Sequence, residues 1–186
     1  MEANLSPERF GTYNSDAAGN TTITFVRQLD HEIDKVWRAI TMPEHRAAWF
    51  AELSLDLELG GQAVVNFSGG DCPPPEDNPS DVYYCKVIQL DPPNLLEYQG
   101  AGEHHRFELK ATMRGCELTF MAMVPAKTQF DDEKQTIISR YSVSCGWHYK
   151  LDQMEWDMAG LDFEDEGYAG PIKTKYYFEY LKRDKK

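Results

Sequence analysis

The fold of this chain is decided by the stretch Gly146-Trp147-His148-Tyr149-Lys150-Leu151-Asp152-Gln153-Met154. In and beyond it, apolar residues recur at intervals of three or four positions: Trp147, Leu151, Met154, Met158 and Leu161. This spacing places the five side chains on one face of an α-helix. The sequence therefore predicts a long amphipathic helix over about residues 144–161. Its opposite face is expected to carry Lys150, Asp152, Gln153 and Asp157.

Upstream of this helix, the apolar pattern changes to period two, which is typical of β-strands. It predicts strands over residues 53–58, 62–68, 81–90, 94–100, 104–113 and 116–124. Turn residues such as Gly60-Gly61 and Asp91-Pro92-Pro93 separate them. Because most connections are short, we expect an antiparallel meander. The proline-rich, acidic segment 69–80 is expected to be an exposed hairpin extension.

Three further elements are expected before the meander. Residues 21–29 are rich in β-branched and aromatic side chains and predict a strand. Asp30 is expected to cap a helix over 32–41, and Pro43 to open a short helix over 43–50. The elements predict an α+β domain with the helices on one side of a curved antiparallel sheet of six to seven strands. One long helix cannot fill the concave face of such a sheet, so a pocket is expected there.

The two ends of the chain differ from this central domain, which we expect to span residues 21–166. Residues 1–20 are rich in Ser, Asn, Gly and Asp and are expected to form an irregular arm. Residues 167–186 form an aromatic and basic extension. Its last part, 173–186, carries six Lys and Arg against two Asp and Glu, whereas 152–166 holds seven acidic residues and no basic one. We expect the extension to dock on its own domain; the alternative is a tail that binds a protein partner.

Composition excludes several classes of protein. The net charge of −12 would repel nucleic acid and an anionic membrane surface. The sequence contains no run of about 18 apolar residues, so no membrane span is predicted. Met1-Glu2-Ala3-Asn4 does not resemble the start of a signal peptide. The four widely spaced cysteines, without a Cys-x-x-Cys pair or a His-x-x-x-His motif, predict reduced thiols and no metal site. A cytoplasmic location is therefore expected, and no cofactor is implied.

Several segments together carry a resemblance to a known family. They are Phe25-Val26-Arg27-Gln28-Leu29, Val36-Trp37-Arg38-Ala39-Ile40-Thr41-Met42-Pro43-Glu44 with Trp49, Leu59-Gly60-Gly61, Val87-Ile88-Gln89-Leu90-Asp91-Pro92-Pro93-Asn94-Leu95-Leu96 and Gly146-Trp147-His148-Tyr149-Lys150-Leu151-Asp152. Over about residues 21–162 the chain resembles the START-like helix-grip (SRPBCC) superfamily, in the branch similar to the activator of the heat-shock-protein-90 ATPase. The resemblance implies a sheet wrapped around a long C-terminal helix, with two short helices after the first strand. Within the branch, the chain resembles the bacterial single-domain members, which need not act on a chaperone. It implies a pocket but no particular reaction, because the superfamily includes carriers, aromatases and cyclases.

Strand alternation suggests which side chains face this pocket. On strand 104–113, His105, Phe107 and Leu109 share the more apolar face, and on strand 81–90 Tyr83 shares a face with Cys85 and Val87. Strand 116–124 leaves the choice between its two faces open. The apolar side chains predicted to line the pocket are Trp37, Tyr83, Phe107, Leu109, Phe120, Trp147, Leu151, Met154 and Met158.

The polar candidates are His105, His148 and Asp152. His148 and Asp152 lie four residues apart on one helix, so the carboxylate could orient the imidazole for general acid–base chemistry. We expect instead a surface pair beside the apolar stripe. The leading hypothesis is a binding protein that holds a hydrophobic or aromatic small molecule between helix and sheet. The alternatives are a co-chaperone-like interaction module that uses the C-terminal extension, and a cyclase-, aromatase- or hydrolase-type enzyme that uses a pocket His or carboxylate such as Glu97.

Overall fold

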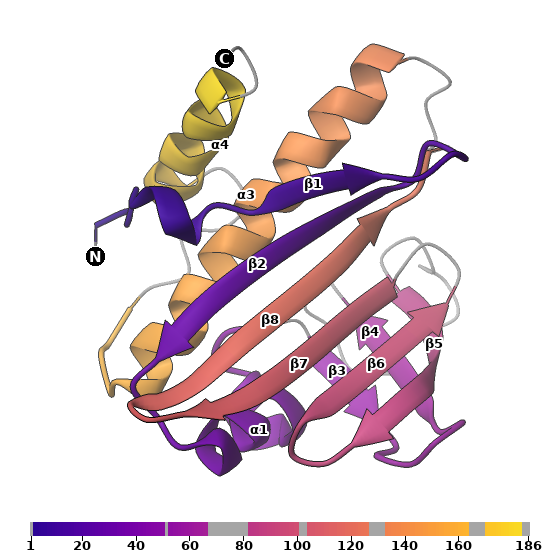
Figure 1. Ribbon diagram of the computed structural model, residues 1–186, viewed down its shortest axis with the longest axis vertical. Coiled ribbons are helices and arrows are strands. Elements are labelled where there is room, and N and C mark those ends of the chain that lie inside the picture. The colour runs from indigo at the N-terminus through magenta and orange to yellow at the C-terminus, as the bar shows by residue number, and fades with distance from the viewer. Residues whose placement is uncertain are drawn as a thin grey trace. The chain divides into compact units, whose positions relative to one another are not determined.

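Figure 1 shows the computed structural model, in which strands follow one another along most of the chain and two helices, Glu133–Met158 and Pro171–Arg183, come last. It describes residues 2–50, 52–66, 82–100, 104–126, 133–163 and 170–183, and the side chains of all these except 52 and 133–139. The described strands form one antiparallel sheet in the order β1-β2-β8-β7-β6-β5-β4-β3. The α+β helix-grip class predicted from the sequence is confirmed, with eight strands in the sheet rather than six to seven. The additional strand is β1, Thr12–Ser15.

The chain divides into two compact units. The first consists of Met1–Val26 and Met123–Lys186, and the second of Arg27–Ala122. The proline-rich segment 69–80, with Cys72, lies outside the described residues. No helix among the described residues is both long enough and apolar enough to cross a membrane.

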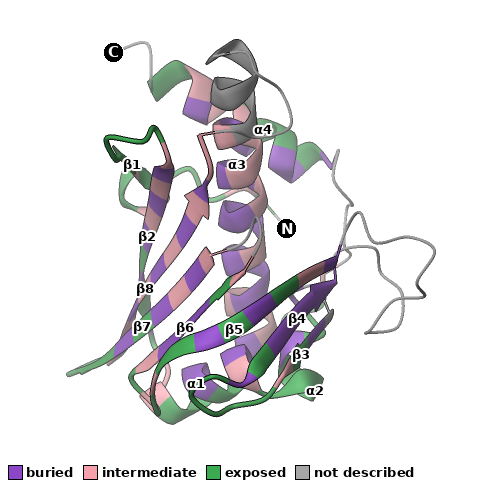
Figure 2. Cartoon of the chain, turned by 90° about the vertical axis from the view of Figure 1, so that its right-hand side faces the viewer, coloured by how far each residue is buried: buried purple, intermediate pink, exposed green. Residues whose placement is uncertain are grey.

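The strands of the second unit follow the predicted meander closely. They are β3 (Glu52–Leu55), β4 (Gln62–Asn66), β5 (Val82–Asp91), β6 (Leu95–Gly100), β7 (His104–Thr112) and most of β8 (Gly115–Val124). Buried and exposed residues alternate along β5 and β7 (Figure 2). Cys85 and Val87 are buried while Tyr84, Lys86 and Ile88 are exposed, so the predicted inner face of β5 is confirmed. Along β8, Leu118, Phe120 and Ala122 are buried, which settles the face that the sequence left open.

The helices that precede the meander are shorter than predicted. α1 spans Ile33–Thr41 and buries one face with Val36, Trp37, Ala39 and Ile40. Its N-cap is Glu32, whose side chain makes no capping hydrogen bond, so the prediction that Asp30 caps the helix was wrong. Pro43 opens α2 as predicted, but α2 ends at Arg46. The buried Arg46 guanidinium donates to the carbonyls of Thr41 and Leu53. These hydrogen bonds tie α2 to the segment on either side of it.

The first unit holds the ends of the chain. Its elements are the 3₁₀-helix η1 (Pro7–Arg9), β1, most of β2 (Thr21–Leu29), α3 (Glu133–Met158) and α4 (Pro171–Arg183). The N-terminal segment expected to be irregular therefore contains a helical turn and a strand. α3 begins at Glu133, well before the predicted start near residue 144. It ends before Gly160, whose φ of +69° breaks the helical path, so Leu161 lies beyond the helix and is 48% exposed.

α3 is buried on more than its apolar stripe, contrary to the prediction. Trp147, Leu151, Met154 and Met158 are buried as expected, but Asp152 and Gln153 are only 1% exposed. α4 lies beside α3 (Figure 1), and the ammonium of Lys173 lies 4.6 Å from the centre of the Tyr149 ring. The expectation that the basic extension docks on its own domain is confirmed by these contacts. A helix with a second partner loses the simple division into an apolar and a solvated face.

Candidate functional site

The inner face of the second unit's sheet carries an aromatic cluster with one polar pair. Tyr98 of β6 lies directly opposite His105 of β7 in the strand register. The Tyr98 hydroxyl and His105 Nδ1 share a hydrogen bond of 3.1 Å, and both side chains are buried, at 0% and 2% exposure. The pair therefore forms a fixed polar contact in apolar surroundings, where hydrogen bonding is strengthened by the low dielectric.

Phenylalanines continue this inner face. Phe107 and Phe120 lie opposite each other on β7 and β8, with their ring centres 4.7 Å apart. The ring of His105 lies 5.8 Å from that of Phe120, and Tyr98 lies 6.4 Å from Phe107. We call Tyr98, His105, Phe107 and Phe120 the inner aromatic cluster. The four side chains are only 0–2% exposed, so in this structure their rings pack against one another.

Glu97 lies on the other face of the same strands. Its two carboxylate oxygens accept hydrogen bonds from Nε2 of His104 and from Arg106, each at 2.6 Å. Arg106 also donates to Gln89 and to Glu108. Glu97, the carboxylate named in the enzyme hypothesis, is thus held in an ion-pair network next to His104. It does not belong to the inner aromatic cluster.

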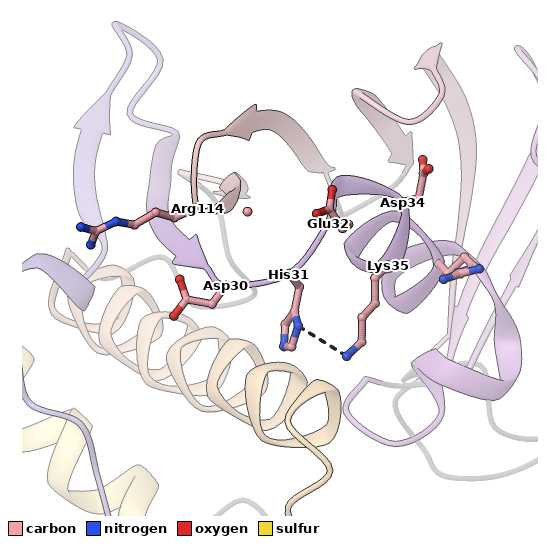
Figure 3. Close-up of a pocket in the computed structure, with 8 residues that line it drawn as sticks. Asp30, His31, Glu32, Asp34, Lys35 and Arg114 are labelled. Atoms are coloured by element: carbon pink, nitrogen blue, oxygen red, sulfur yellow. Dashed lines mark hydrogen bonds between the residues drawn. The ribbon is translucent and has the colours of Figure 1, made fainter.

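A polar groove of about 550 Å³ opens at one end of the second unit (Figure 3). Its lining comes from the turn between β2 and α1, from α1 itself and from the β7–β8 hairpin: Asp30, His31, Glu32, Asp34, Lys35, Arg38, Arg114 and Gly115. Gly115 has a φ of +144°, and a Cβ there would overlap the carbonyl oxygen of Leu29. Glycine therefore allows the hairpin to approach the turn closely.

The groove is balanced in charge and differs from the predicted hydrophobic cavity. Three carboxylates and three cationic side chains line it. His31 Nδ1 lies 3.4 Å from the Lys35 ammonium. Burial and then the charge of Lys35 lower the pKa of His31, so the neutral imidazole is favoured at pH 7. Polar ligands could pair with the charged side chains that line the groove.

His148 of α3 lies in an aromatic cluster in the first unit. Its ring stacks on Tyr176 of α4 at 3.9 Å, and Phe10 contacts it edge-on at 4.8 Å. His148 Nδ1 shares a hydrogen bond of 3.3 Å with the Tyr180 hydroxyl. The histidine is 0% exposed, and Phe25 of β2 also lies beside it, with the ring centres 6.1 Å apart.

Asp152 is the charged centre of this cluster. Arg9 Nη2 donates to Asp152 Oδ1 at 2.6 Å and to Glu155 at 2.7 Å, and the Tyr176 hydroxyl donates to Asp152 Oδ2. Burial lowers the pKa of Arg9, but the Glu155 and Asp152 carboxylates outweigh it and raise the pKa above its ordinary value. Burial, followed by the Asp152 charge, raises the pKa of Tyr176 well above its usual range. The guanidinium therefore stays charged and the phenol stays protonated.

The expectation of a surface pair at His148 and Asp152 was wrong. Nε2 of His148 lies 3.9 Å from Asp152 Oδ1, yet both side chains are fully buried. The carboxylate is satisfied by Arg9 and Tyr176, so it is not dedicated to orienting the imidazole. The polar face of the helix is buried because tyrosines and an arginine supply the hydrogen bonds that water would otherwise give.

The predicted pocket residues fall into two sets. Trp37, Tyr83, Phe107, Leu109, Phe120 and His105 belong to the second unit; all are buried except Tyr83, which is half-buried. Trp147, Leu151, Met154, Met158, His148 and Asp152 belong to α3 in the first unit. Their assignment to one ligand cavity stays a prediction.

Sequence reasoning missed Tyr98 and the partners of His148. Tyr98 could have been found by aligning strands 94–100 and 104–113 as a tight hairpin, which places it opposite His105. The α4 stripe of Ile172, Tyr176 and Tyr180 was visible at intervals of four residues. Arg9 and Phe10 carry no local signal, because only tertiary structure brings them to α3.

Comparison with known proteins identifies the family. The profile of the family described as "Activator of Hsp90 ATPase homolog 1-like protein" matches residues 30–156. A search of curated proteins found no match. Arg9, Phe10 and α4 therefore lie outside the matched residues, whereas His105, His148 and Asp152 lie inside them.

Solved structures share the fold at low sequence identity. The conserved protein of unknown function EF2215 from Enterococcus faecalis is 15% identical with a TM-score of 0.67, covering 93% of this chain and 91% of that one. CalU16 from Micromonospora echinospora is 18% identical with a TM-score of 0.61, covering 92% and 94%. MLL2253 from Mesorhizobium loti is 18% identical with a TM-score of 0.58, covering 76% of this chain and 99% of that one.

Proposed function

Because this chain belongs to the family of activator of Hsp90 ATPase homolog 1-like proteins, we propose that it is a binding protein for a hydrophobic or aromatic small molecule. The family is compatible with ligand binding. The observation that carries the proposal is the inner aromatic cluster, in which one buried imidazole–phenol pair stands among phenylalanine rings. Binding sites for small molecules commonly combine an apolar wall with a few fixed polar groups.

The cluster favours a planar ligand. A planar ring that entered the cluster would stack on the two phenylalanine rings and reach the Tyr98–His105 pair with one polar edge. A flexible, fully apolar chain would use the rings but would gain nothing from the polar pair. The sequence adds Trp147, Leu151, Met154 and Met158 as further ligand contacts, and this part of the proposal rests on the sequence alone.

Titration with 1-naphthol and naphthalene, followed by NMR of labelled Phe, Tyr and His side chains, tests the proposal. We expect saturable shifts at the cluster, with 1-naphthol bound about 10-fold more tightly because its hydroxyl can engage the polar pair. Phe107→Leu should weaken binding about 10-fold. Tyr84→Leu is the matched control, because Tyr84 is exposed on the outer face. If neither probe gives saturable shifts at the cluster, the cluster is packing only.

We propose, as a second candidate function, that the C-terminal extension binds an acidic protein. One face of α4 exposes Lys175, Phe178 and Lys182, and Phe178 is 55% exposed. Residues 173–186 carry a net charge of +4 in a chain of −12. A basic face with an exposed aromatic anchor is suited to an acidic partner.

Affinity capture with the full chain and with a Lys175→Glu/Phe178→Asp/Lys182→Glu variant tests this second candidate. A genuine partner should be lost with the variant, and its purified form should bind the wild-type chain with an affinity that falls as salt rises. A partner retained equally by both proteins would contradict binding through α4. The Phe107→Leu variant is the control, because it leaves this face unchanged.

A further inference from the structure

The two ends of the chain meet on the polar face of α3. Hydrogen bonds join the N-terminal arm, residues 4–11, to α4, and an ion pair joins it to α3. We infer that the arm and α4 form one latch, in which neither element holds its place without the other. The residues of the latch are Asn4, Arg9, Phe10 and Gly11 from the arm, and Tyr176, Tyr180 and Arg183 from α4. This inference does not rest on the proposed ligand.

Asp152 is the anchor that the two elements share. Arg9 from the arm donates to one carboxylate oxygen and Tyr176 from α4 donates to the other. The carboxylate is 1% exposed, so water cannot replace a lost donor unless the latch opens. Removing one partner of a buried charge costs more free energy than the interaction contributes to stability, because the charge stays buried without its partner. Loss of either donor therefore weakens the hold of the other.

The arm and α4 also contact each other directly. The backbone N–H of Asn4 donates to the Tyr176 hydroxyl at 3.1 Å, and that of Gly11 donates to the Tyr180 hydroxyl at 3.0 Å. The Arg183 guanidinium lies 3.8 Å from the centre of the Phe10 ring. Departure of α4 would thus leave two backbone donors of the arm without their acceptors.

Phe10 completes the cover of His148. Its ring contacts His148 at 4.8 Å and Tyr180 at 4.9 Å, both edge-on. Opening of the latch would expose His148 and release the aromatic face of α4 together. The availability of the buried aromatic face of α4 to any other molecule is therefore set by the N-terminal arm, more than a hundred and sixty residues away in sequence.

Hydrogen exchange by mass spectrometry on the full chain, with Arg9→Met, tests the latch. Methionine keeps the apolar bulk of the side chain and removes its charge. We expect exchange to accelerate about 10-fold or more in residues 172–182 of α4, although the substitution lies in the arm. Acylation of His148 by diethylpyrocarbonate, followed by peptide mass spectrometry, should accelerate by a similar factor because the imidazole becomes accessible.

Two further variants keep the test decisive. Lys182→Ala changes the exposed side of α4, where Lys182 pairs with Glu179, and should leave exchange in the arm unchanged. Tyr176→Phe keeps the ring but removes the hydroxyl. It should accelerate hydrogen exchange in residues 4–11 and acylation of His148. Amides of 105–109 report on global unfolding and should not change. If Arg9→Met and Tyr176→Phe each affect only their own element, or neither, the arm and α4 dock independently and the latch is refuted.

Discussion

Each unit of this protein buries a histidine against a tyrosine hydroxyl, but the two pairs are assembled in different ways. His105 and Tyr98 are seven residues apart and lie opposite each other in adjacent strands. His148 and Tyr180 are 32 residues apart on two helices, and Phe10 of the N-terminal arm packs against both. A pair built by strand register forms whenever the sheet forms. A pair built from the two ends of the chain exists only while both ends are docked, and it can open without unfolding the sheet.

The largest effect on stability is expected when one phenylalanine ring is removed from each of the two aromatic clusters in turn. Phe107→Ala should lower the free energy of unfolding by about 3–5 kcal/mol, because Phe107 is 2% exposed in the middle of the sheet. Phe10→Ala removes an equally large ring, but we expect a smaller loss, because the latch can open locally. Urea unfolding followed by circular dichroism measures both.

Hydrogen exchange locates the loss that each deletion causes. In Phe107→Ala it should rise throughout the second unit, whereas in Phe10→Ala it should rise in residues 4–11 and 172–182 only. Equal losses of unfolding free energy, spread over the whole chain in both variants, would contradict the difference between the two regions.

The sequence predicted the inner face of the sheet because alternation is a local property. His105, Phe107 and Leu109 had to share a face once residues 104–113 formed a strand, and all three are buried. The predicted ends of strands and starts of helices were less accurate, as the N-cap at Glu32 shows. Capping depends on a few competing side chains.

The second buried face of α3 was not predicted because amphipathic analysis assumes one partner for each helix. Asp152 was assigned to solvent on its charge, but Arg9 and Tyr176 provide its hydrogen bonds. The polar groove was also missed. Asp30 and Arg114 meet there because Gly115 lets a hairpin approach a distant turn, and no periodic pattern reports such a contact.

The next effect concerns pH and tests how tightly α3 is packed. Burial raises the pKa of the Cys145 thiol to about 11, against an ordinary value near 9. Between these values the unfolded chain has lost the proton and the folded chain has kept it. Stability should therefore fall as pH rises from about 9 to 11, by the order of 1–2 kcal/mol from this thiol.

The alkaline effect is measured as a difference between the wild type and Cys145→Ala. Other groups titrate in this range, so the comparison uses the slope of unfolding free energy against pH rather than its absolute value. The variant should show the shallower slope. Parallel slopes in the two proteins would indicate that the thiol ionises as readily in the folded chain as in the unfolded one.

The smallest expected effect isolates the two tyrosine hydroxyls. Tyr98→Phe removes the hydrogen bond to His105 but keeps the ring, so it should lower the free energy of unfolding by about 1 kcal/mol. Exchange in the N-terminal arm should stay unchanged. Tyr180→Phe removes the acceptor of the Gly11 amide and the contact to His148. It should therefore accelerate hydrogen exchange at Gly11, and it should lower the free energy of unfolding by less than Tyr98→Phe does.

Tyr84→Phe is the control for both substitutions, because Tyr84 is 57% exposed and its loss should change stability by less than about 0.5 kcal/mol. If Tyr98→Phe also released the arm, the register-built pair would depend on the ends of the chain. If Tyr180→Phe lowered global stability as much as Tyr98→Phe and left Gly11 protected, the arm would be an integral part of the folded core. Either result would remove the distinction between the two histidine pairs, because both would then open only with the whole fold.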